Sequence, residues 1–341
     1  MNKHIKHLLV NCGIYTKLFN TYYTYKFREA RLLKEIEEFK AKYYIQTSDA
    51  VPFTHEKIVI AMFDGKRFHG GLADRLRGII SLYLLCKKYH IRFKIYFIYP
   101  FNLLDFFQPN SYDWRIQEKD IIYDAKYSEP IILDTIEQYG NEKKFQMNYL
   151  TDKILNSPKR QFHVYTNAAF SMSRKIYPKL FSELFVPSYY LKKELNTINK
   201  QIKCEYINAA FRFLNLLGDF NEMGVDPLPD EEKRLLITAC VNQLYKLHKK
   251  NKKNILVTSD SITFLEEVSK CEFVITNKGK ILHVDFSEDN RKEMHLKTFI
   301  DFLLIANAQE VYLFRTGKMY KSGFAKSASL IYGRPYYEIV F

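Results

Sequence analysis

The chain has 341 residues, of which 47% are hydrophobic and 26% charged, and this balance is typical of a globular protein rather than a disordered one. The formal net charge of +14 predicts a surface that attracts polyanions, whether nucleic acid, an anionic membrane or phosphate-bearing small molecules. Five scattered cysteines without a C-x-x-C pair disfavour a disulfide framework or structural zinc site and indicate a cytoplasmic compartment. No apolar run is long enough for a membrane span, and no signal peptide is recognisable, so we expect neither insertion nor secretion.

The first 45 residues form a basic and aromatic segment. Glu29 is the only acid before Lys34, in a stretch rich in Lys, Arg, Tyr and Phe. Two interpretations stay open here. The segment could bind peripherally at an anionic membrane surface, or it could be a helical extension packed on the domain that follows.

From residue 57 onward, short apolar strands alternate with helices. We expect strands over 57–63, 93–99 and 161–167, with helices over 72–89 and 191–202. The second part repeats the alternation, with predicted strands over 206–213, 254–260, 281–285 and 310–316 and helices over 230–248, 262–269, 293–306 and from about 322. This order predicts an α/β protein with two Rossmann-type halves facing a cleft.

The predicted organisation has three parts. They are an N-terminal extension (1–45), an acceptor-side domain (46–195) and a nucleotide-sugar-binding domain (196–341), with the boundary between about 185 and 203. In open α/β sheets, ligands bind beyond the carboxyl ends of the strands. The residues that follow the predicted strands are therefore the first candidates for a site.

The segment HGGLADRLRG (69–78) joins a loop to a predicted helix. Its candidate ligand-binding residues are His69, Gly70, Gly71 and Arg75, because glycines let a backbone approach an anion at a helix N-terminus. Arg75 and Arg77 lie about 200° apart around a helix, so at most one can face the anion that the glycines face. The alternative is a solvated surface arginine. The segment is neither a P-loop nor a dinucleotide-binding fingerprint.

Arg212 lies within an apolar strand pattern, AAFRF (209–213). Arg212 either pairs with a buried carboxylate or binds a phosphate through its planar guanidinium. We favour the phosphate because a polar loop with Asp219 and Glu222 follows. Asp219 could instead be a turn residue. Both acids, and also Asp74, are candidates for a catalytic base.

Two further acidic positions are candidates. Asp260 and Ser261 end a strand and are suited to hold a ribose or a base edge, although Ser-Asp-Ser before a helix is also an ordinary N-cap. Asp301 is the only charge in the run FIDFLLIA (299–306), so it is expected to be paired structurally or to support a site arginine.

The strongest local signal is RTGKMYKSGF (315–324), a strand followed by a basic loop and a helix that opens at Ser322, Gly323 and Phe324. Such a helix N-terminus suits a diphosphate. The alternative is that Ser322 only caps the helix. No two aspartates form the D-x-D pattern that chelates a metal on a nucleotide diphosphate, so we expect no metal and no cofactor.

These motifs, in this order, resemble those of the GDP-fucose-dependent fucosyltransferase superfamily, which has the two-Rossmann-domain fold called GT-B. The similarity covers about residues 60–335 and rests on GGLADRLRG, LFVPSYYLKKEL (184–195), AAFRF, TSDS (258–261) and the segment 301–331. The resemblance implies that Arg212 contacts the β-phosphate of the donor and its leaving oxygen. It further implies that Asp260 and Ser261 hold the nucleoside, that residues 322–324 form the phosphate-binding turn and that Asp301 is the acid preceding it.

The resemblance departs at one point, because many members have His-x-Arg where Ala210 and Phe211 precede Arg212. The implied activity is transfer of fucose from GDP-fucose to a glycan acceptor, with inversion and without a metal, in surface polysaccharide or glycan synthesis at the inner membrane face. One alternative is a GT-B transferase that uses another nucleotide sugar. Others are a basic nucleic-acid-binding protein and an inactive scaffold on a membrane, but no nucleic-acid-binding module is recognisable.

Overall fold

The computed structural model describes residues 33–44, 56–133, 142–167, 169, 173–202, 204–219, 224–277, 279 and 291–341. The predicted strand over 281–285, the candidate Glu222 and the first 32 residues lie outside these ranges. No helix of the described ranges is long and apolar enough to cross a membrane.

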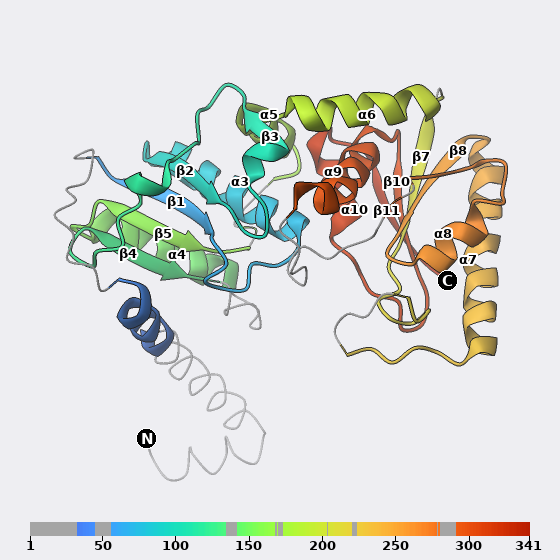
Figure 1. The fold of residues 1–341 in the computed structure, drawn as a ribbon, viewed down its shortest axis with the longest axis horizontal. Helices are drawn as coiled ribbons and strands as arrows, with labels where there is room; N and C mark the ends of the chain where they lie inside the picture. The colour runs from blue at the N-terminus through green and yellow to red at the C-terminus, as the bar shows by residue number, and fades with distance from the viewer. Residues whose placement is uncertain are drawn as a thin grey trace, which may run out of the picture.

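The first half is a four-stranded parallel sheet (Figure 1). Its strands β1 (Ile58–Phe63), β2 (Arg92–Phe97), β4 (Ser128–Ile132) and β5 (Gln161–Tyr165) lie in the order β2-β1-β5-β4, and α3 (Leu72–Lys88) packs against β1 and β2. The predictions for β1, α3, β2 and β5 are confirmed to within a few residues. Helix α4 (Glu142–Asn156) was not predicted, nor was the edge strand β4, in which Pro130 hides the strand signal.

The N-terminal extension reaches the first sheet through a helix over 33–43. Ile36, Phe39 and Tyr44 are buried, and the ring of Phe39 meets that of Tyr165 edge-on at 5.1 Å. The Tyr44 hydroxyl lies 2.7 Å from Nδ1 of His163. Residues 33–44 are therefore a packed helical extension, while the interpretation of residues 1–32 stays a prediction.

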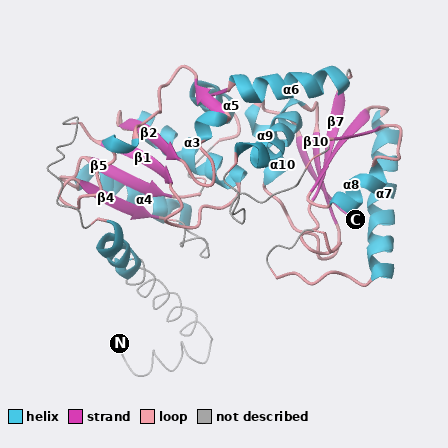
Figure 2. Cartoon of the chain, viewed as in Figure 1, coloured by secondary structure: helices cyan, strands magenta, loops and turns pink. Residues whose placement is uncertain are grey.

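The second half is a five-stranded parallel sheet in the order β11-β10-β7-β8-β9. Its strands are β7 (Tyr206–Phe211), β8 (Asn254–Ser259), β9 (Val274–Thr276), β10 (Val311–Arg315) and β11 (Tyr336–Val340). The helices α7 (Asp230–Asn251) and α8 (Ile262–Val268) lie on the side away from the first half, whereas α9 (Lys292–Asn307) and α10 (Phe324–Ile331) lie between the sheets (Figures 1 and 2). The short β9 and the partly exposed edge strand β11 were not predicted.

The chain passes from one half to the other through α5 (Tyr177–Leu184), β6 (Phe185–Pro187) and α6 (Tyr189–Ile202). Strand β6 pairs antiparallel with β3 (Phe107–Pro109), and two short 3-10 helices lie nearby over Leu103–Asp105 and Glu118–Asp120. Helix α6 contacts α9. The predicted boundary at residue 195 falls inside α6 and stays a prediction.

The hydrophobic core is continuous across the two halves. Phe299 of α9 stacks on Phe106 with ring centroids 3.9 Å apart, and it meets Phe101 and Phe107 edge-on. A second cluster lies between the outer face of the second sheet and helices α7 and α8. The aromatic contacts hold α9 and α10 against the first half, which sets the ends of α3 and α10 facing each other.

Candidate functional site

Arg212 lies directly after β7, at the carboxyl end of the central strand of the second sheet. Its backbone carbonyl accepts a hydrogen bond from the N–H of Tyr320 (3.0 Å), in the loop between β10 and α10. Its Nε lies 3.4 Å from Oδ2 of Asp260, and 18% of its side chain is exposed. The ends of β7, β8 and β10 therefore meet around Arg212. Pairing with a buried carboxylate, the less favoured of its two alternatives, is what the structure shows. Binding of a phosphate by Arg212 stays a prediction.

Asp260 is buried and holds the turn that follows β7. Its Oδ1 accepts a hydrogen bond from the N–H of Phe213 (2.8 Å), and its Oδ2 accepts one from Leu214 (2.7 Å), whose φ is +55°. Burial raises the pKa of Asp260, with the Arg212 charge acting in the opposite direction. These contacts fix the backbone beside Arg212, and binding of the nucleoside by Asp260 stays a prediction.

Ser261 and Asp219 together cap α8. The Ser261 hydroxyl accepts from the N–H of Phe264 (3.1 Å) and donates to Oδ2 of Asp219 (2.8 Å), which also accepts from the N–H of Thr263 (2.7 Å). The N-cap alternative for Ser261 is thus what the structure shows. The proposed catalytic role of Asp219 stays a prediction, and this carboxylate is engaged at a helix terminus.

The predicted phosphate-binding turn opens α10. The Ser322 hydroxyl accepts from the N–H of Phe324 (3.2 Å), Gly323 occupies the N-cap position, and the Phe324 ring packs on Phe302 at 5.1 Å. The first turn of a helix leaves N–H groups without intrahelical partners and carries the positive end of the dipole. An anion of the size of a diphosphate would be stabilised there.

Arg77 of α3 faces this turn from the first half. Its Nη1 lies 3.7 Å from the position that a Cβ atom on Gly323 would take, and its Nη2 donates to Oδ1 of Asp74. A guanidinium beside a helix N-terminus places two positive groups together, which favours an anion between or beside them. Of the two arginines in the glycine segment, Arg77 is therefore the one that faces the candidate phosphate site.

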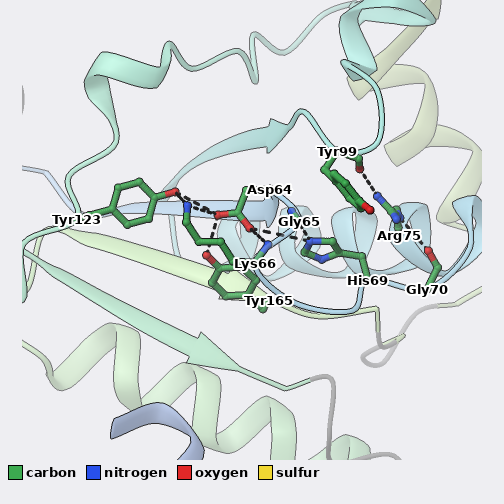
Figure 3. A network of polar contacts seen from close by, with 9 residues as sticks. All are labelled: Asp64, Gly65, Lys66, His69, Gly70, Arg75, Tyr99, Tyr123 and Tyr165. Atoms are coloured by element: carbon green, nitrogen blue, oxygen red, sulfur yellow. Dashed lines mark hydrogen bonds and ion pairs between the residues drawn. The ribbon is translucent and has the colours of Figure 1, made fainter. Parts of the chain in front are cut away.

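Arg75, which we expected to bind the donor, is fully buried and forms hydrogen bonds with the backbone around the glycine loop. Its Nε donates to the carbonyl of Gly70 (2.8 Å) and its Nη1 to that of Tyr99 (2.5 Å), as Figure 3 shows. His69 is also buried, and its Nε2 accepts from the N–H of Gly65 (3.1 Å). Burial, together with the charge of Arg75, lowers the pKa of His69 to about 3. For both residues, direct contact with a donor stays a prediction, while Gly70 and Gly71 lie on the loop that begins α3.

A buried acid, Asp64, anchors the same loop (Figure 3). It follows β1 and accepts hydrogen bonds from Tyr123 (3.1 Å), Tyr165 (3.0 Å) and Lys66 Nζ (2.8 Å). Burial opposes its ionisation, but the contacts with Lys66 and Tyr165 outweigh burial, so the pKa of Asp64 lies below its usual value. The network ties the start of the loop between β1 and α3 to Tyr165 of β5 and to Tyr123.

Asp301 forms polar contacts with its neighbours on and beside α9. Its Oδ1 accepts from Asn277 (2.6 Å), and its Oδ2 pairs with Lys297 (2.6 Å) one turn earlier on α9. Structural pairing, one of its two alternatives, is what is observed. Within the described ranges, no group of three or more His, Cys, Asp or Glu residues is placed to hold a metal ion.

The sequence did not identify Asp64 or Asn167 as candidate site residues, and it did not predict the orientation of Arg77. Asp64 directly follows a fully buried strand, IVIAMF, so the rule that sites lie at strand ends would have found it. Asn167 comes two residues after β5 and could have been found in the same way. The orientation of Arg77 depends on how the halves pack, which no local pattern records.

Two parallel α/β sheets with a polar site between them define a GT-B fold. Solved structures share this fold. A variant of Arabidopsis thaliana FUT1 in complex with GDP superposes with a TM-score of 0.54 at 12% identity, covering 89% of this chain and 74% of that chain. Two structures of the fucosyltransferase NodZ, one from Bradyrhizobium and one an α-1,6-fucosyltransferase co-crystallised with GDP, each give a TM-score of 0.51 at 15% identity. Both cover 82% of this chain, and 94% and 93% of the respective NodZ chains.

At the level of the fold, these similarities confirm the resemblance to GDP-fucose-dependent fucosyltransferases that the sequence motifs indicated. No protein-family model and no curated protein sequence matches the chain.

Proposed function

We propose that this protein is an inverting fucosyltransferase that transfers fucose from GDP-fucose to a hydroxyl of a glycan acceptor. The proposal rests on positive groups contributed by both halves. They are Arg212, whose backbone carbonyl binds the loop before α10, the N-terminus of α10, and Arg77 close to that N-terminus. Such a site suits a diphosphate. Two structures of the same fold were solved with GDP, which supports a guanine nucleotide as the molecule that carries this diphosphate.

In the proposed reaction, an acceptor oxygen attacks the anomeric carbon from the face opposite GDP. The bond from that carbon to the β-phosphate oxygen breaks, GDP leaves with the electron pair, and the acceptor proton passes to a base. Negative charge grows on the departing diphosphate, so preorganised donors lower the barrier. Arg212 and the first turn of α10 are the groups placed to supply that stabilisation.

We further propose that the enzyme acts in the cytoplasm on a surface polysaccharide or a related glycan, and that residues 1–32 bring it to the anionic inner face of a membrane. The basic and aromatic composition of these residues supports this placement. No metal ion or nucleic acid takes part in the proposed function.

The first test is calorimetric titration with GDP at 50 mM and about 300 mM salt, because binding that rests only on polyanion attraction falls steeply with salt. We expect one saturable site that persists at the higher salt and is weakened by Arg212→Gln. The matched control is Arg115→Gln, which removes an exposed arginine paired with Asp113. Binding of GDP that vanishes at the higher salt, or equal weakening by both variants, would contradict the proposal.

A thermal-shift screen of nucleotide sugars then addresses the donor. We expect the largest stabilisation with GDP-fucose. A larger shift with a UDP- or TDP-sugar would instead favour the alternative of a GT-B transferase with a different donor. If only oligonucleotides stabilise the protein, and only at low salt, the result would favour a nucleic-acid-binding protein.

A further inference from the structure

Asp74 and Asn167 approach the same point beside Gly70. A Cβ atom on Gly70, whose φ is +76°, would lie 3.2 Å from Nδ2 of Asn167 and 3.3 Å from Oδ2 of Asp74. The glycine therefore lets a carboxylate of α3 and an amide that follows β5 approach the same point. A side chain at residue 70 would push them apart.

A close contact between α3 and the end of β5 places Asn167 there. A Cβ atom on Gly78 would lie 2.4 Å from the carbonyl oxygen of Thr166 and 3.2 Å from Cα of Asn167, so only glycine permits this approach. Asn167 is 8% exposed, and its buried Oδ1 has no hydrogen-bond partner among the described residues. An unsatisfied buried amide oxygen is costly and invites a ligand that brings a hydroxyl donor.

Asp74 is an accessible carboxylate near the amide group of Asn167, since both approach the Cβ position of Gly70. Its side chain is 37% exposed, and Arg77 pairs with its Oδ1. The other described candidate for the base, Asp219, has one oxygen engaged at the N-terminus of α8 and its second oxygen buried. Asp74 is therefore accessible, and it lies near an amide whose oxygen, Oδ1 of Asn167, has no hydrogen-bond partner in the described part of the chain.

Arg77 connects this pair to the candidate phosphate site. It contacts Asp74 on one side and lies close to Gly323 of α10 on the other. Its Nε is buried and has no partner in the described part of the chain, and its charge acts on the fully buried hydroxyl of Tyr177, which likewise has none. One guanidinium thus fixes the carboxylate at a set position relative to the diphosphate.

We propose that Asp74 and Asn167 form the subsite for the acceptor hydroxyls, with Asp74 as the catalytic base and Arg77 as its positioning residue. This inference rests on the proposed function and names its acceptor as a carbohydrate with two neighbouring free hydroxyls. Asn167 Oδ1 accepts a hydrogen bond from one hydroxyl. The other gives its proton to Asp74 as its oxygen bonds to the anomeric carbon and GDP departs.

The test uses the full-length protein and GDP-fucose, with release of GDP as the readout. The acceptor probes are water, a panel of free mono- and disaccharides, and sodium azide, a nucleophile that has no proton to lose. Asp74→Asn should lower kcat with the best hydroxyl acceptor by about 10²-fold or more, the scale of a lost general base, and leave the Kd for GDP unchanged within about twofold. Azide turnover should equal that of the wild type.

The matched control is Asp113→Asn, which breaks an exposed Asp–Arg pair of the same half and should alter neither kcat nor Kd. Asn167→Ala should raise KM for the saccharide acceptor at least tenfold with little change in turnover with water. Arg77→Lys should lower kcat while the melting temperature stays within a few degrees of the wild type.

The outcomes separate the two proposals. Wild-type protein that neither binds GDP nor consumes GDP-fucose overturns the proposed function. Active wild-type protein whose Asp74→Asn variant keeps more than half of its kcat with hydroxyl acceptors overturns the subsite and leaves the function standing. Loss of azide and hydroxyl turnover together in Asp74→Asn would also overturn the assignment of the base.

Discussion

Asp260 lies beside Arg212, with 3.4 Å between the carboxylate oxygen and the guanidinium nitrogen, at the point where β7 and β8 both end. The same carboxylate binds the N–H groups of Phe213 and Leu214. Two backbone N–H groups, as well as Arg212, stabilise the negative charge of Asp260. If the arginine is lost, these two hydrogen bonds still stabilise the buried carboxylate. A catalytic effect of Arg212 can therefore be separated from a structural one.

Arg212→Lys should fold normally and lose activity. Lysine preserves a positive charge beside Asp260, but it cannot make the planar, two-pronged contact with a diphosphate. We expect kcat for GDP-fucose to fall by about 10²-fold or more, with a smaller effect on the affinity for GDP and a nearly unchanged melting temperature. Steady-state kinetics and thermal unfolding of one preparation check both.

If Arg212 serves only as a structural partner of Asp260, the pattern reverses. Arg212→Ala would then destabilise the fold by about 3–5 kcal/mol while its folded fraction turns over at the normal rate. A stable, fully active Arg212→Lys protein would likewise disprove the assignment of the active site to the end of β7.

Gly78→Ala should be strongly destabilising. The added Cβ would lie 2.4 Å from a backbone carbonyl of Thr166, so α3 must move away from β5. Overpacking of this kind costs about 1–3 kcal/mol. The control is Gly323→Ala, whose Cβ would meet its nearest atom at 3.7 Å and should leave stability almost unchanged in urea unfolding. Equal unfolding midpoints for the two variants would disprove the close approach.

Acid should destabilise the first half through two buried histidines. Burial is the main cause that lowers the pKa of both His69 and His163 to about 3, whereas an unfolded histidine titrates near 6.5. The neutral forms contribute stability that is complete above about pH 6.5 and is lost as the pH falls toward 3, because the unfolded chain then binds protons that the folded chain does not. At pH 5 the loss amounts to roughly 2 kcal/mol for each histidine.

Urea unfolding at pH 7 and pH 5 measures this effect. His163→Gln should reduce the difference in unfolding free energy between the two pH values, whereas His90→Asn, at an exposed position with φ of +54°, should leave it as in the wild type. A wild-type protein equally stable at both pH values would show that these histidines titrate normally.

Deletion of residues 1–32 should abolish binding to anionic membranes and spare the fold. The truncation keeps the helix over 33–43, whose Ile36 and Phe39 are buried against the first sheet. Sedimentation with phosphatidylserine vesicles should fall to the level seen with neutral vesicles, because each basic residue near such a surface contributes about 1 kcal/mol. The affinity for GDP should be unchanged. If the truncated protein sediments with phosphatidylserine vesicles as well as the full-length protein does, residues 1–32 have no role in membrane binding.

The sequence predicted the regular part of the fold well, because long helices and fully buried parallel strands have strong periodic patterns. It missed elements in which local signals conflict with tertiary context, such as β4 with its internal Pro130 and the three-residue β9. For the site, residue type and position beyond a strand were enough to select Arg212 and the Ser322 turn. They could not distinguish Arg75 from Arg77, since both lie on α3. Packing within the first half buries Arg75 against the carbonyls of Gly70 and Tyr99, and packing of α3 against α10 brings Arg77 close to Gly323.

The stacking of Phe299 on Phe106, at 3.9 Å, has a consequence for how substrates enter and leave. Enzymes built from two separate lobes often open by rotation about a flexible connector. Here such a rotation would expose buried aromatic rings, including Phe106 and Phe299, to water. Exchange of GDP should therefore depend on movement of the short loops that border the site, and calorimetric unfolding should show one transition rather than one for each lobe.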